Sequence, residues 1–387
     1  MKEILTAFLI IICSASIAQT SRDFFYVKTN DSLPYLKYGN GEDRLGGAKI
    51  SPIDSNVILK VVDSFQTDYK IQLSQYHSAW IEKNSVIKTD TPSILHHLTD
   101  NWKVYGDSLF DYVTIQLDQK LPYESSMEID PSLIVVDIFD AASNTNWIQQ
   151  LTSAKEIKNV WYEQYEDDVV RVFIELNHLQ HWGYSIYYDD ANKLTVRVKR
   201  QPASLALKDM TIAIDAGHGG SNIGTTGSSK DTQEKNLTLL FAKDLETELL
   251  LRKAKVVMTR VDDTTMSMYE RMKFLDQQSP DLLISLHLNE ADNDTVRGVS
   301  TYYRYVAFRP LSEAILHRML ETGLDEFGNI GSFNFALNGP TEYPNCLVEI
   351  AFLSNKEDEK KILDPGFRML VVKKISDGVA DFLKNLK

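Results

Sequence analysis

The sequence predicts an α/β fold class: a C-terminal domain with a largely parallel sheet and helices on both faces, preceded by two small all-β domains. Three observations predict it. Before about residue 205, apolar and polar residues alternate over many short stretches, and all five tryptophans lie there. Beyond it, strand-like apolar runs alternate with helical patterns, which is typical of a largely parallel sheet. Between the two regions, Gln201-Pro202-Ala203-Ser204 is a polar segment with a helix-breaking proline.

Length and charge restrict the classes of protein that remain. The chain has 387 residues, which predicts two or three domains at roughly 100–200 residues each. It carries 41 Lys and Arg against 54 Asp and Glu, so its formal net charge is -13. A general nucleic-acid binder needs a basic face, and the sequence has no block of positive charge. We therefore expect no nucleic-acid partner.

The first 18 residues have the pattern of a secretory signal peptide. An apolar run from Ile4 to Ile12 follows a short charged start, and Ser16 and Ala18 are the small residues that precede cleavage after Ala18. The run is too short for a comfortable membrane span, although an uncleaved anchor is the alternative. We expect an exported protein of the periplasm or cell envelope, with no transmembrane segment in the mature chain.

Cysteine usage limits the chemistry of any metal site. Cleavage after Ala18 would remove Cys13 and leave Cys346 alone, which allows no internal disulfide. A metal site in the mature chain would therefore have to use histidine and carboxylate ligands. An exported protein without disulfides suits a bacterial envelope.

Residues 22–90 are predicted to form the first β domain. Val57–Val62 and Tyr69–Leu73 are strand-like, and Ala79-Trp80-Ile81 closes the unit as a last short strand. The spacing of these strands and the Ala79-Trp80-Ile81 ending resemble a bacterial SH3-like barrel.

Residues 100–200 are predicted to form the second β domain. Its strand-like stretches are Asp111–Leu117, Leu133–Ile138, Val169–Leu176 and Leu194–Val198. This unit resembles the AMIN domain, which stands in front of cell-wall amidases; the resemblance implies that it targets the enzyme to the wall. We expect its Trp and Tyr residues to form the core of a β-sandwich, with stacking of a subset on glycan as the alternative.

Residues 208–387 are predicted to form the α/β domain. The expected strands are Met210–Asp215, Val256–Thr259, Leu282–Leu288, Gly298–Arg304 and Cys346–Ile350, and the expected helices are Glu234–Arg252, Met268–Gln277, Leu311–Phe327 and Gly366–Leu383. In such sheets, sites form beyond the carboxyl ends of the strands.

Four candidate site residues lie at such positions. His218 follows the first strand in a Gly-rich loop, His287 and Glu349 lie near the ends of two later strands, and Glu234 opens the first helix. Zn²⁺ takes imidazole and carboxylate ligands, and a catalytic zinc keeps one position for a water whose pKa it lowers to about 7. We predict that His218, Glu234 and His287 bind Zn²⁺ and that Glu349 is the catalytic base.

The same residues lie in motifs that resemble the zinc-dependent N-acetylmuramoyl-L-alanine amidases of bacterial cell-wall turnover. The motifs are Ile212–Gly220, Glu234-Lys235-Asn236-Leu237, Thr259-Arg260, Arg271, Ser285–Asn289 and Leu347–Asn355. The resemblance implies zinc at His218, Glu234 and His287, and a catalytic Glu349. It also implies hydrolysis of the amide between the lactyl group of N-acetylmuramic acid and L-alanine of the stem peptide, in cell-wall remodelling or daughter-cell separation.

The sequence leaves partners and rival functions open. Peptidoglycan is the expected partner, and a protein activator at the envelope is possible. One rival is a non-catalytic peptidoglycan-binding or regulatory protein that uses the amidase-like part as a scaffold. The other is a zinc peptidase acting on the same polymer. Ala216, where many amidases have proline, departs from the family pattern, as does the segment 334–343.

Overall fold

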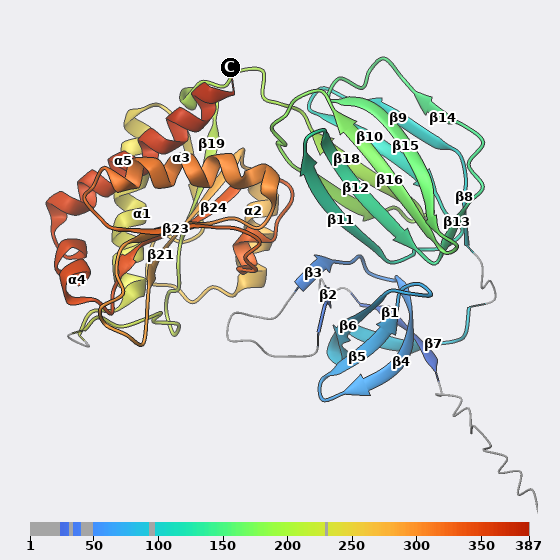
Figure 1. Cartoon of the computed structure of the whole chain (residues 1–387), viewed down its shortest axis with the longest axis horizontal. Helices are drawn as coiled ribbons and strands as arrows, with labels where there is room; N and C mark the ends of the chain where they lie inside the picture. The colour runs from blue at the N-terminus through green and yellow to red at the C-terminus, as the bar shows by residue number, and fades with distance from the viewer. Residues whose placement is uncertain (1–23, 31–33, 40–48, 93–96, 229–230, 387) are drawn as a thin grey trace, which may run out of the picture.

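The protein is described by a computed structural model that covers residues 24–30, 34–39, 49–92, 97–228 and 231–386 (Figure 1). The predicted signal peptide at 1–18, including Cys13, lies outside these residues. None of the helices in the described part of the chain combines the length and apolar character that a membrane crossing requires.

The N-terminal unit is a single antiparallel sheet in the strand order β3-β2-β6-β5-β4-β1-β7. Its strands are β1 (Phe25–Thr29), β2 (Tyr35–Lys37), β3 (Lys49–Pro52), β4 (Ile58–Phe65), β5 (Asp68–Gln72), β6 (Ser78–Glu82) and β7 (Val86–Thr89). The three predicted strands correspond to β4, β5 and β6. Alternate residues such as Leu59, Val61 and Ile71 are buried, because one face of the sheet covers the core.

The second unit packs two sheets face to face (Figure 1), and their neighbouring strands are antiparallel except for β14, which is parallel to β9. One sheet has the order β14-β9-β10-β18-β17 and the other β11-β12-β16-β15, with a small β13-β8 pair beside them. The strands are β8 (His97–Thr99), β9 (Trp102–Gly106), β10 (Phe110–Gln116), β11 (Tyr123–Ile129), β12 (Ser132–Phe139), β13 (Ala141–Ser143), β14 (Ile148–Gln150), β15 (Ile157–Glu166), β16 (Val169–Leu176), β17 (Tyr184–Tyr188) and β18 (Lys193–Lys199).

The tryptophans of this unit do not all belong to its core. Trp102 is buried against the ring of Tyr162, as expected of a sandwich core. Trp147 is 62% exposed, so the expectation of burial is wrong for it. Trp182 is buried, but in the core of the C-terminal domain, where its ring lies 6.2 Å from that of Phe382.

The C-terminal unit is a mixed sheet in the order β20-β19-β21-β24-β22-β23. Its strands are β19 (Thr211–Ala216), β20 (Lys255–Met258), β21 (Leu282–Asn289), β22 (Val299–Tyr302), β23 (Glu326–Ile330) and β24 (Asn345–Phe352), and its helices are α1 (Glu234–Leu251), α2 (Met268–Gln278), α3 (Arg309–Leu320), α4 (Lys356–Ile362) and α5 (Pro365–Asn385). β22 is antiparallel to β24, whereas the other neighbouring strands are parallel. The antiparallel pair makes the sheet mixed.

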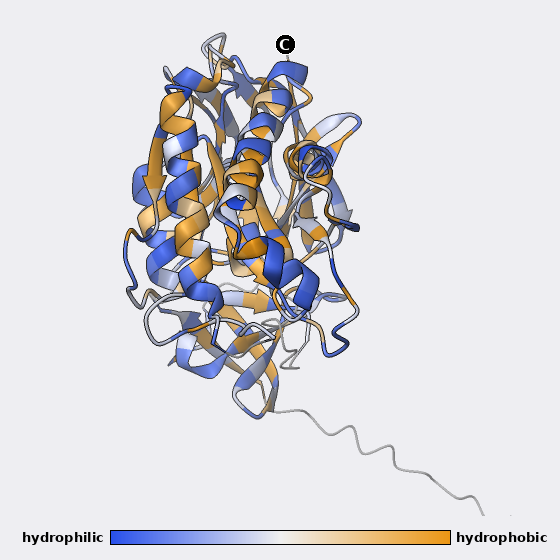
Figure 2. Ribbon diagram, turned by 90° about the vertical axis from the view of Figure 1, so that its left-hand side faces the viewer, coloured by the Kyte–Doolittle hydropathy of each residue, from blue (hydrophilic) through white to orange (hydrophobic). Residues whose placement is uncertain are grey.

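Helices cover both faces of this sheet. Ile212 and Ile214 of β19 share a core with α1, α3 and α5, whereas Ala213 between them packs with Leu275 of α2 on the other face. This alternation follows from the two-residue period of a strand. Hydrophilic and hydrophobic residues alternate around the helices in Figure 2, as expected when one side of each helix packs on the sheet.

One predicted helix was wrong at its C-terminal end, and the strand β23 and the helix α4 were not predicted. The helix expected to extend to Phe327 ends at Leu320, and residues 326–330 form the edge strand β23. Gly323, with a φ of +78°, lies between them, and such left-handed glycines commonly end helices. The short helix α4 begins after Asn355, which caps it by accepting hydrogen bonds from the N–H groups of Glu357 and Asp358.

The three units are docked on one another. Ala307 and Phe308 of the C-terminal unit belong to the core of the all-β region. Tyr184 and Thr341 exchange two hydrogen bonds of 2.8 Å between β17 and the segment before β24. The polar segment 201–204 therefore does not separate freely moving parts, because packing and hydrogen bonds cross it.

Candidate metal centre

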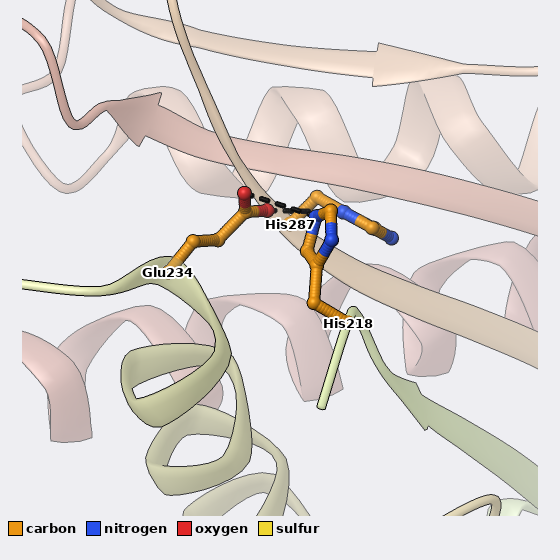
Figure 3. A group of neighbouring side chains, drawn as sticks. All are labelled: His218, Glu234 and His287. Carbon is orange, nitrogen blue, oxygen red and sulfur yellow. Dashed lines mark hydrogen bonds and ion pairs between the residues drawn. The ribbon is translucent and has the colours of Figure 1, made fainter. Parts of the chain in front are cut away.

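The structure brings three of the four predicted site residues into one cluster (Figure 3). His218 follows β19, Glu234 is the first residue of α1, and His287 lies in β21. Oε2 of Glu234 lies 3.0 Å from Nε2 of His218, and Oε1 lies 3.0 Å from Nδ1 of His287. The ligand atoms of the three residues all lie within 4.8 Å of one another, so the group could hold a metal ion.

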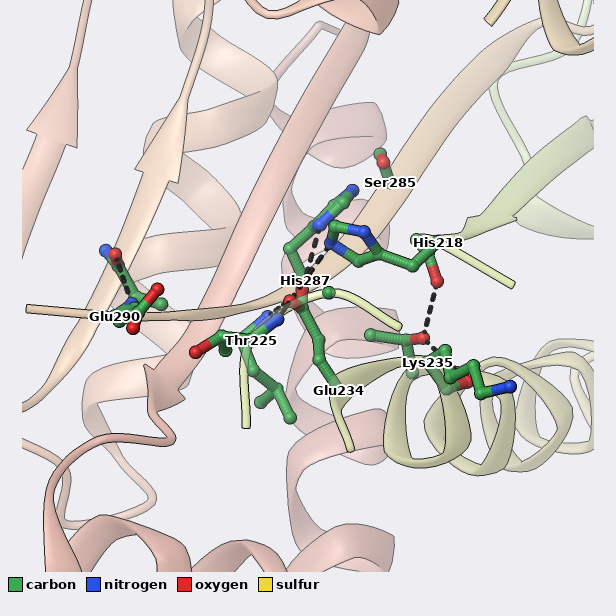
Figure 4. A network of polar contacts seen from close by, with 12 residues as sticks. His218, Thr225, Glu234, Lys235, Ser285, His287 and Glu290 are labelled. Atoms are coloured by element: carbon green, nitrogen blue, oxygen red, sulfur yellow. Dashed lines mark hydrogen bonds and ion pairs between the residues drawn. The ribbon is translucent and has the colours of Figure 1, made fainter. Parts of the chain in front are cut away.

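Glu234 is held in place as an ionised carboxylate. Its Oε1 accepts a hydrogen bond from the N–H of Leu288 at 3.0 Å, and its Oε2 accepts one from Thr225 at 2.8 Å (Figure 4). Its burial opposes ionisation, but the hydrogen bonds to both histidines outweigh burial and lower its pKa well below the usual value. Its position at the N-terminus of α1 favours the negative charge further.

The loop after β19 presents His218 in an unusual backbone conformation. Its φ is +61°, a region that non-glycine residues rarely adopt. Its Nδ1 is hydrogen-bonded to Oδ1 of Asn222 at 3.0 Å, which favours the tautomer that leaves Nε2 as the ligand atom. Burial lowers the pKa of His218, but its hydrogen bond to Glu234 outweighs burial and raises the pKa above the usual value.

Two glycines leave space for the cluster. A Cβ atom on Gly217 would lie 2.4 Å from Cε1 of His287, and one on Gly224 would lie 2.4 Å from Oε2 of Glu234. Any side chain at these positions would displace the side chains of the cluster. The backbone can approach the cluster this closely only because both residues lack a side chain.

Glu349, the fourth predicted residue, lies beside the cluster and outside the ligand group. It is opposite His287 in the register of β21 and β24. It is only 6% exposed, and no described residue hydrogen-bonds to its Oε2. Burial, with the charge of Glu234 as a second cause, raises its pKa well above the usual range. Its carboxyl group is therefore uncommitted and close to the predicted ligands.

A buried network behind the cluster was not predicted as part of the site. Asp215 at the end of β19 accepts hydrogen bonds from Thr259 and Ser285, each at 2.7 Å, and from Arg271. Arg271 also donates to the carbonyls of Ala216 and His218. Burial raises the pKa of Asp215, but the Arg271 charge and the hydrogen bonds outweigh it and lower the pKa. Its residues lie in motifs that resemble the amidase family, but the sequence assigned them no role in the site.

The donor set fits zinc. Two imidazole nitrogens and one carboxylate oxygen are the ligands of many catalytic zinc sites, in which the fourth position stays open for water. The described residues of the cluster include no thiolate. The C-terminal part is thus an α/β domain with a mixed sheet and a His–Glu–His group that could hold a metal ion.

Comparison with known families then identifies it. Residues 212–381 match the N-acetylmuramoyl-L-alanine amidase family model, and residues 100–198 match the AMIN domain. The C-terminal domain of this chain belongs to the N-acetylmuramoyl-L-alanine amidase family and follows an AMIN domain.

Several proteins that are similar to this chain are named as amidases. A probable cell wall amidase, LytH of Staphylococcus aureus, is 32% identical over 176 residues, which are 45% of this chain and 58% of the relative. This chain therefore spans little more than half the length of that curated relative. The catalytic domain of the amidase CwlV from Bacillus (Paenibacillus) polymyxa var. colistinus is 30% identical, with a TM-score of 0.44 over 45% of this chain and 98% of that chain. An amidase from Clostridium difficile 630 is 29% identical, with a TM-score of 0.44 over 46% and 98%.

Proposed function

We propose that this protein hydrolyses the amide between the lactyl group of N-acetylmuramic acid and L-alanine in peptidoglycan, with zinc held by His218, Glu234 and His287. The observation that carries the proposal is the uncommitted, buried carboxyl group of Glu349 beside the His–Glu–His group in a domain of this amidase family. Zinc, when bound there, would supply a Lewis acid and a water that ionises near neutral pH.

The chain's own residues have separable roles in this proposal. His218, Glu234 and His287 bind the ion, and the hydrogen bonds of Thr225 and Leu288 orient Glu234. Glu349 takes the proton of the attacking water and returns it to the leaving amine of L-alanine. Burial raises its pKa above that of an ordinary carboxyl group, which suits the return of the proton to the leaving amine.

The β-rich modules are proposed to hold the enzyme on the cell wall. The AMIN domain match supports a location outside the cytoplasm, and the predicted signal peptide at 1–18 would provide export. We further propose that residues 22–90 are an SH3-like module of the same enzyme. For this combination of domains we propose a role in wall remodelling or daughter-cell separation.

The test is zinc content together with digestion of purified peptidoglycan by the mature chain and by its Glu349→Gln variant. We expect one zinc per chain in both, and free stem peptides from the first alone, because the substitution removes the base and keeps the ligands. Glu357→Gln is the matched control, since that glutamate is a 74% exposed surface residue of the same domain. It should retain full activity.

Three results would contradict parts of the proposal. Substantial turnover by Glu349→Gln would remove the proposed base. Release of single residues or cleaved cross-links, in place of whole stem peptides, would favour the zinc peptidase. Bound zinc with no product from the unmodified chain would favour the non-catalytic protein, or an enzyme that needs an activator.

A further inference from the structure

A cavity of about 580 Å³ lies where the three units meet, away from the candidate metal centre. Tyr35 of the first unit, Tyr187 and Arg197 of the AMIN domain, and Lys273 and Glu342 of the amidase domain all line it. The cavity flanks the segment before β24, whereas Glu349 is the fifth residue of that strand. From Asn345 to Glu349 the strand alone extends about 13 Å. The cavity is thus a separate site.

Its walls are aromatic and rigid. Tyr123 and Tyr184 are buried and Tyr305 is partly buried. Hydrogen bonds from their hydroxyl groups to Ile186 at 3.0 Å, Ser125 at 2.9 Å and Gly339 at 2.9 Å, respectively, fix the three rings. At the rim, Tyr187 and Tyr269 are 36% and 43% exposed. Tyrosine rings in such positions offer flat apolar surfaces beside polar groups. Because hydrogen bonds fix the wall tyrosines, the cavity has its shape before any ligand binds.

The charged groups of the cavity are unpaired within the described residues. Arg197, Lys273 and Asp276 form neither ion pairs nor side-chain hydrogen bonds there, although the Arg197 guanidinium lies 4.8 Å from the centre of the Phe110 ring. The carboxyl of Glu342 accepts only backbone N–H groups, and its burial raises its pKa to about 7. Other half-buried arginines of the AMIN domain are paired, as Arg171 is with Asp137 at 2.7 Å. Groups left unpaired in a preformed cavity are available to a ligand.

We propose that this inter-domain cavity binds N-acetylated sugar units of a glycan strand, as a second contact with the polymer beyond the candidate metal centre. This inference rests on the proposed function for the choice of polymer. The C–H faces of a pyranose ring stack on tyrosine rings. Its hydroxyl and acetamido groups can pair with the acid and base side chains that the cavity holds unpaired. A carboxyl that is partly protonated, as at Glu342, can donate as well as accept.

The lining argues against other ligand classes. Glu342 and Asp276 would repel a polyanion such as a nucleic acid, and four charged side chains would be costly to bury under a lipid chain. An N-acetylglucosamine unit is neutral, has many hydroxyl groups, and matches a lining that combines rings with both signs of charge. A stem peptide is the remaining competitor, and binding measurements can separate it from a sugar.

The test uses the full mature chain carrying Glu349→Gln, so that the polymer stays intact. Calorimetric titration would measure its affinity for glycan strands stripped of stem peptides, for tri-N-acetylchitotriose and for free stem peptide. We expect the glycan probes to bind. Lys273→Ala should weaken their binding about tenfold, because it removes a charged hydrogen-bond donor at an exposed helix position. Tyr187→Ala should weaken it about fivefold through lost stacking.

Tyr165→Ala is the matched control, since Tyr165 is an exposed tyrosine of the same domain that lies on another sheet and outside the cavity. It should bind as the parent does. Equal affinities of Tyr187→Ala, Lys273→Ala and Tyr165→Ala would overturn the proposal, as would binding of stem peptide in preference to stripped glycan. The amidase proposal is tested separately, because the chain with Glu349 intact either cleaves peptidoglycan or does not, whatever the stripped strands do.

Discussion

The guanidinium of Arg271 donates a hydrogen bond to the main-chain carbonyl of His218. His218 has a φ of +61°, and its side chain is one of the three proposed zinc ligands. Arg271 also bonds to Asp215, which joins the neighbouring strands β19 and β21 through Ser285. One fully buried side chain thus supports the strained loop that presents a proposed ligand, and such supporting contacts commonly tune metal affinity.

Replacing Arg271 with lysine should weaken zinc binding by about 10- to 100-fold. Lysine keeps the charge, but it lacks the planar fork that reaches Asp215, Ala216 and His218 together. Competition with a chromogenic chelator would measure the zinc Kd. Arg252→Lys is the control, because Arg252 pairs with Glu248 and Asp377 far from the cluster. Identical zinc affinities for the two variants would show that Arg271 does not position His218.

Removing the metal should lower the melting temperature of the protein. A ligand at a thousand times its Kd stabilises the folded state by about 4 kcal/mol, so a chelator should reverse that shift. His287→Ala should abolish the zinc-dependent shift, because a site with three protein ligands tolerates the loss of one poorly. His317→Ala, at an exposed position of α3, should keep the shift. A full shift in His287→Ala would exclude His287 as a ligand.

The folded state should lose stability in acid through His181. Burial lowers the pKa of His181 to about 4, with a hydrogen bond to the Glu128 carbonyl as a smaller, opposite effect. Between pH 6.5 and 4 the unfolded chain binds a proton at this residue and the folded chain does not. Stability attributable to His181 therefore falls as pH falls, by about 1.4 kcal/mol per pH unit. Urea unfolding across this range would measure the slope.

His181→Gln should flatten that slope, whereas His317→Gln should leave it unchanged. Both variants remove one imidazole, but only His181 is buried. An unchanged slope in His181→Gln would mean that other groups cause the acid sensitivity.

Trp182→Ala should destabilise the amidase domain although Trp182 precedes it in the chain. The indole is 1% exposed and packs with Phe382 of α5, so its removal should cost about 3–5 kcal/mol. Trp147→Ala, at a 62% exposed position, should change the free energy of unfolding by less than about 0.5 kcal/mol. Equal effects of the two substitutions on the free energy of urea unfolding would contradict the packing of Trp182 in the core of the amidase domain. An amidase domain cut at residue 205 should be destabilised for the same reason.

Strand and helix patterns were enough to predict the candidate ligands. His218, Glu234 and His287 lie at the ends of elements whose apolar runs and helical periods are visible in the sequence, and parallel strands bring such ends together. The family motifs then implied the metal and the reaction. These signals are local, since each depends on neighbouring residues and on the period of a single element.

Tertiary structure decided what depends on contacts between distant segments. The sequence did not reveal that Arg271 would reach Asp215 and the His218 carbonyl. Nor did it reveal that Trp182 would pack in the core of the amidase domain and not in that of the β-sandwich. It also did not reveal the cavity where Arg197 and Glu342 meet. The period of apolar residues shows which face of a helix or strand is apolar. It does not show which other surface covers that face, because burial favours any apolar surface of complementary shape. That choice is made only when the units pack.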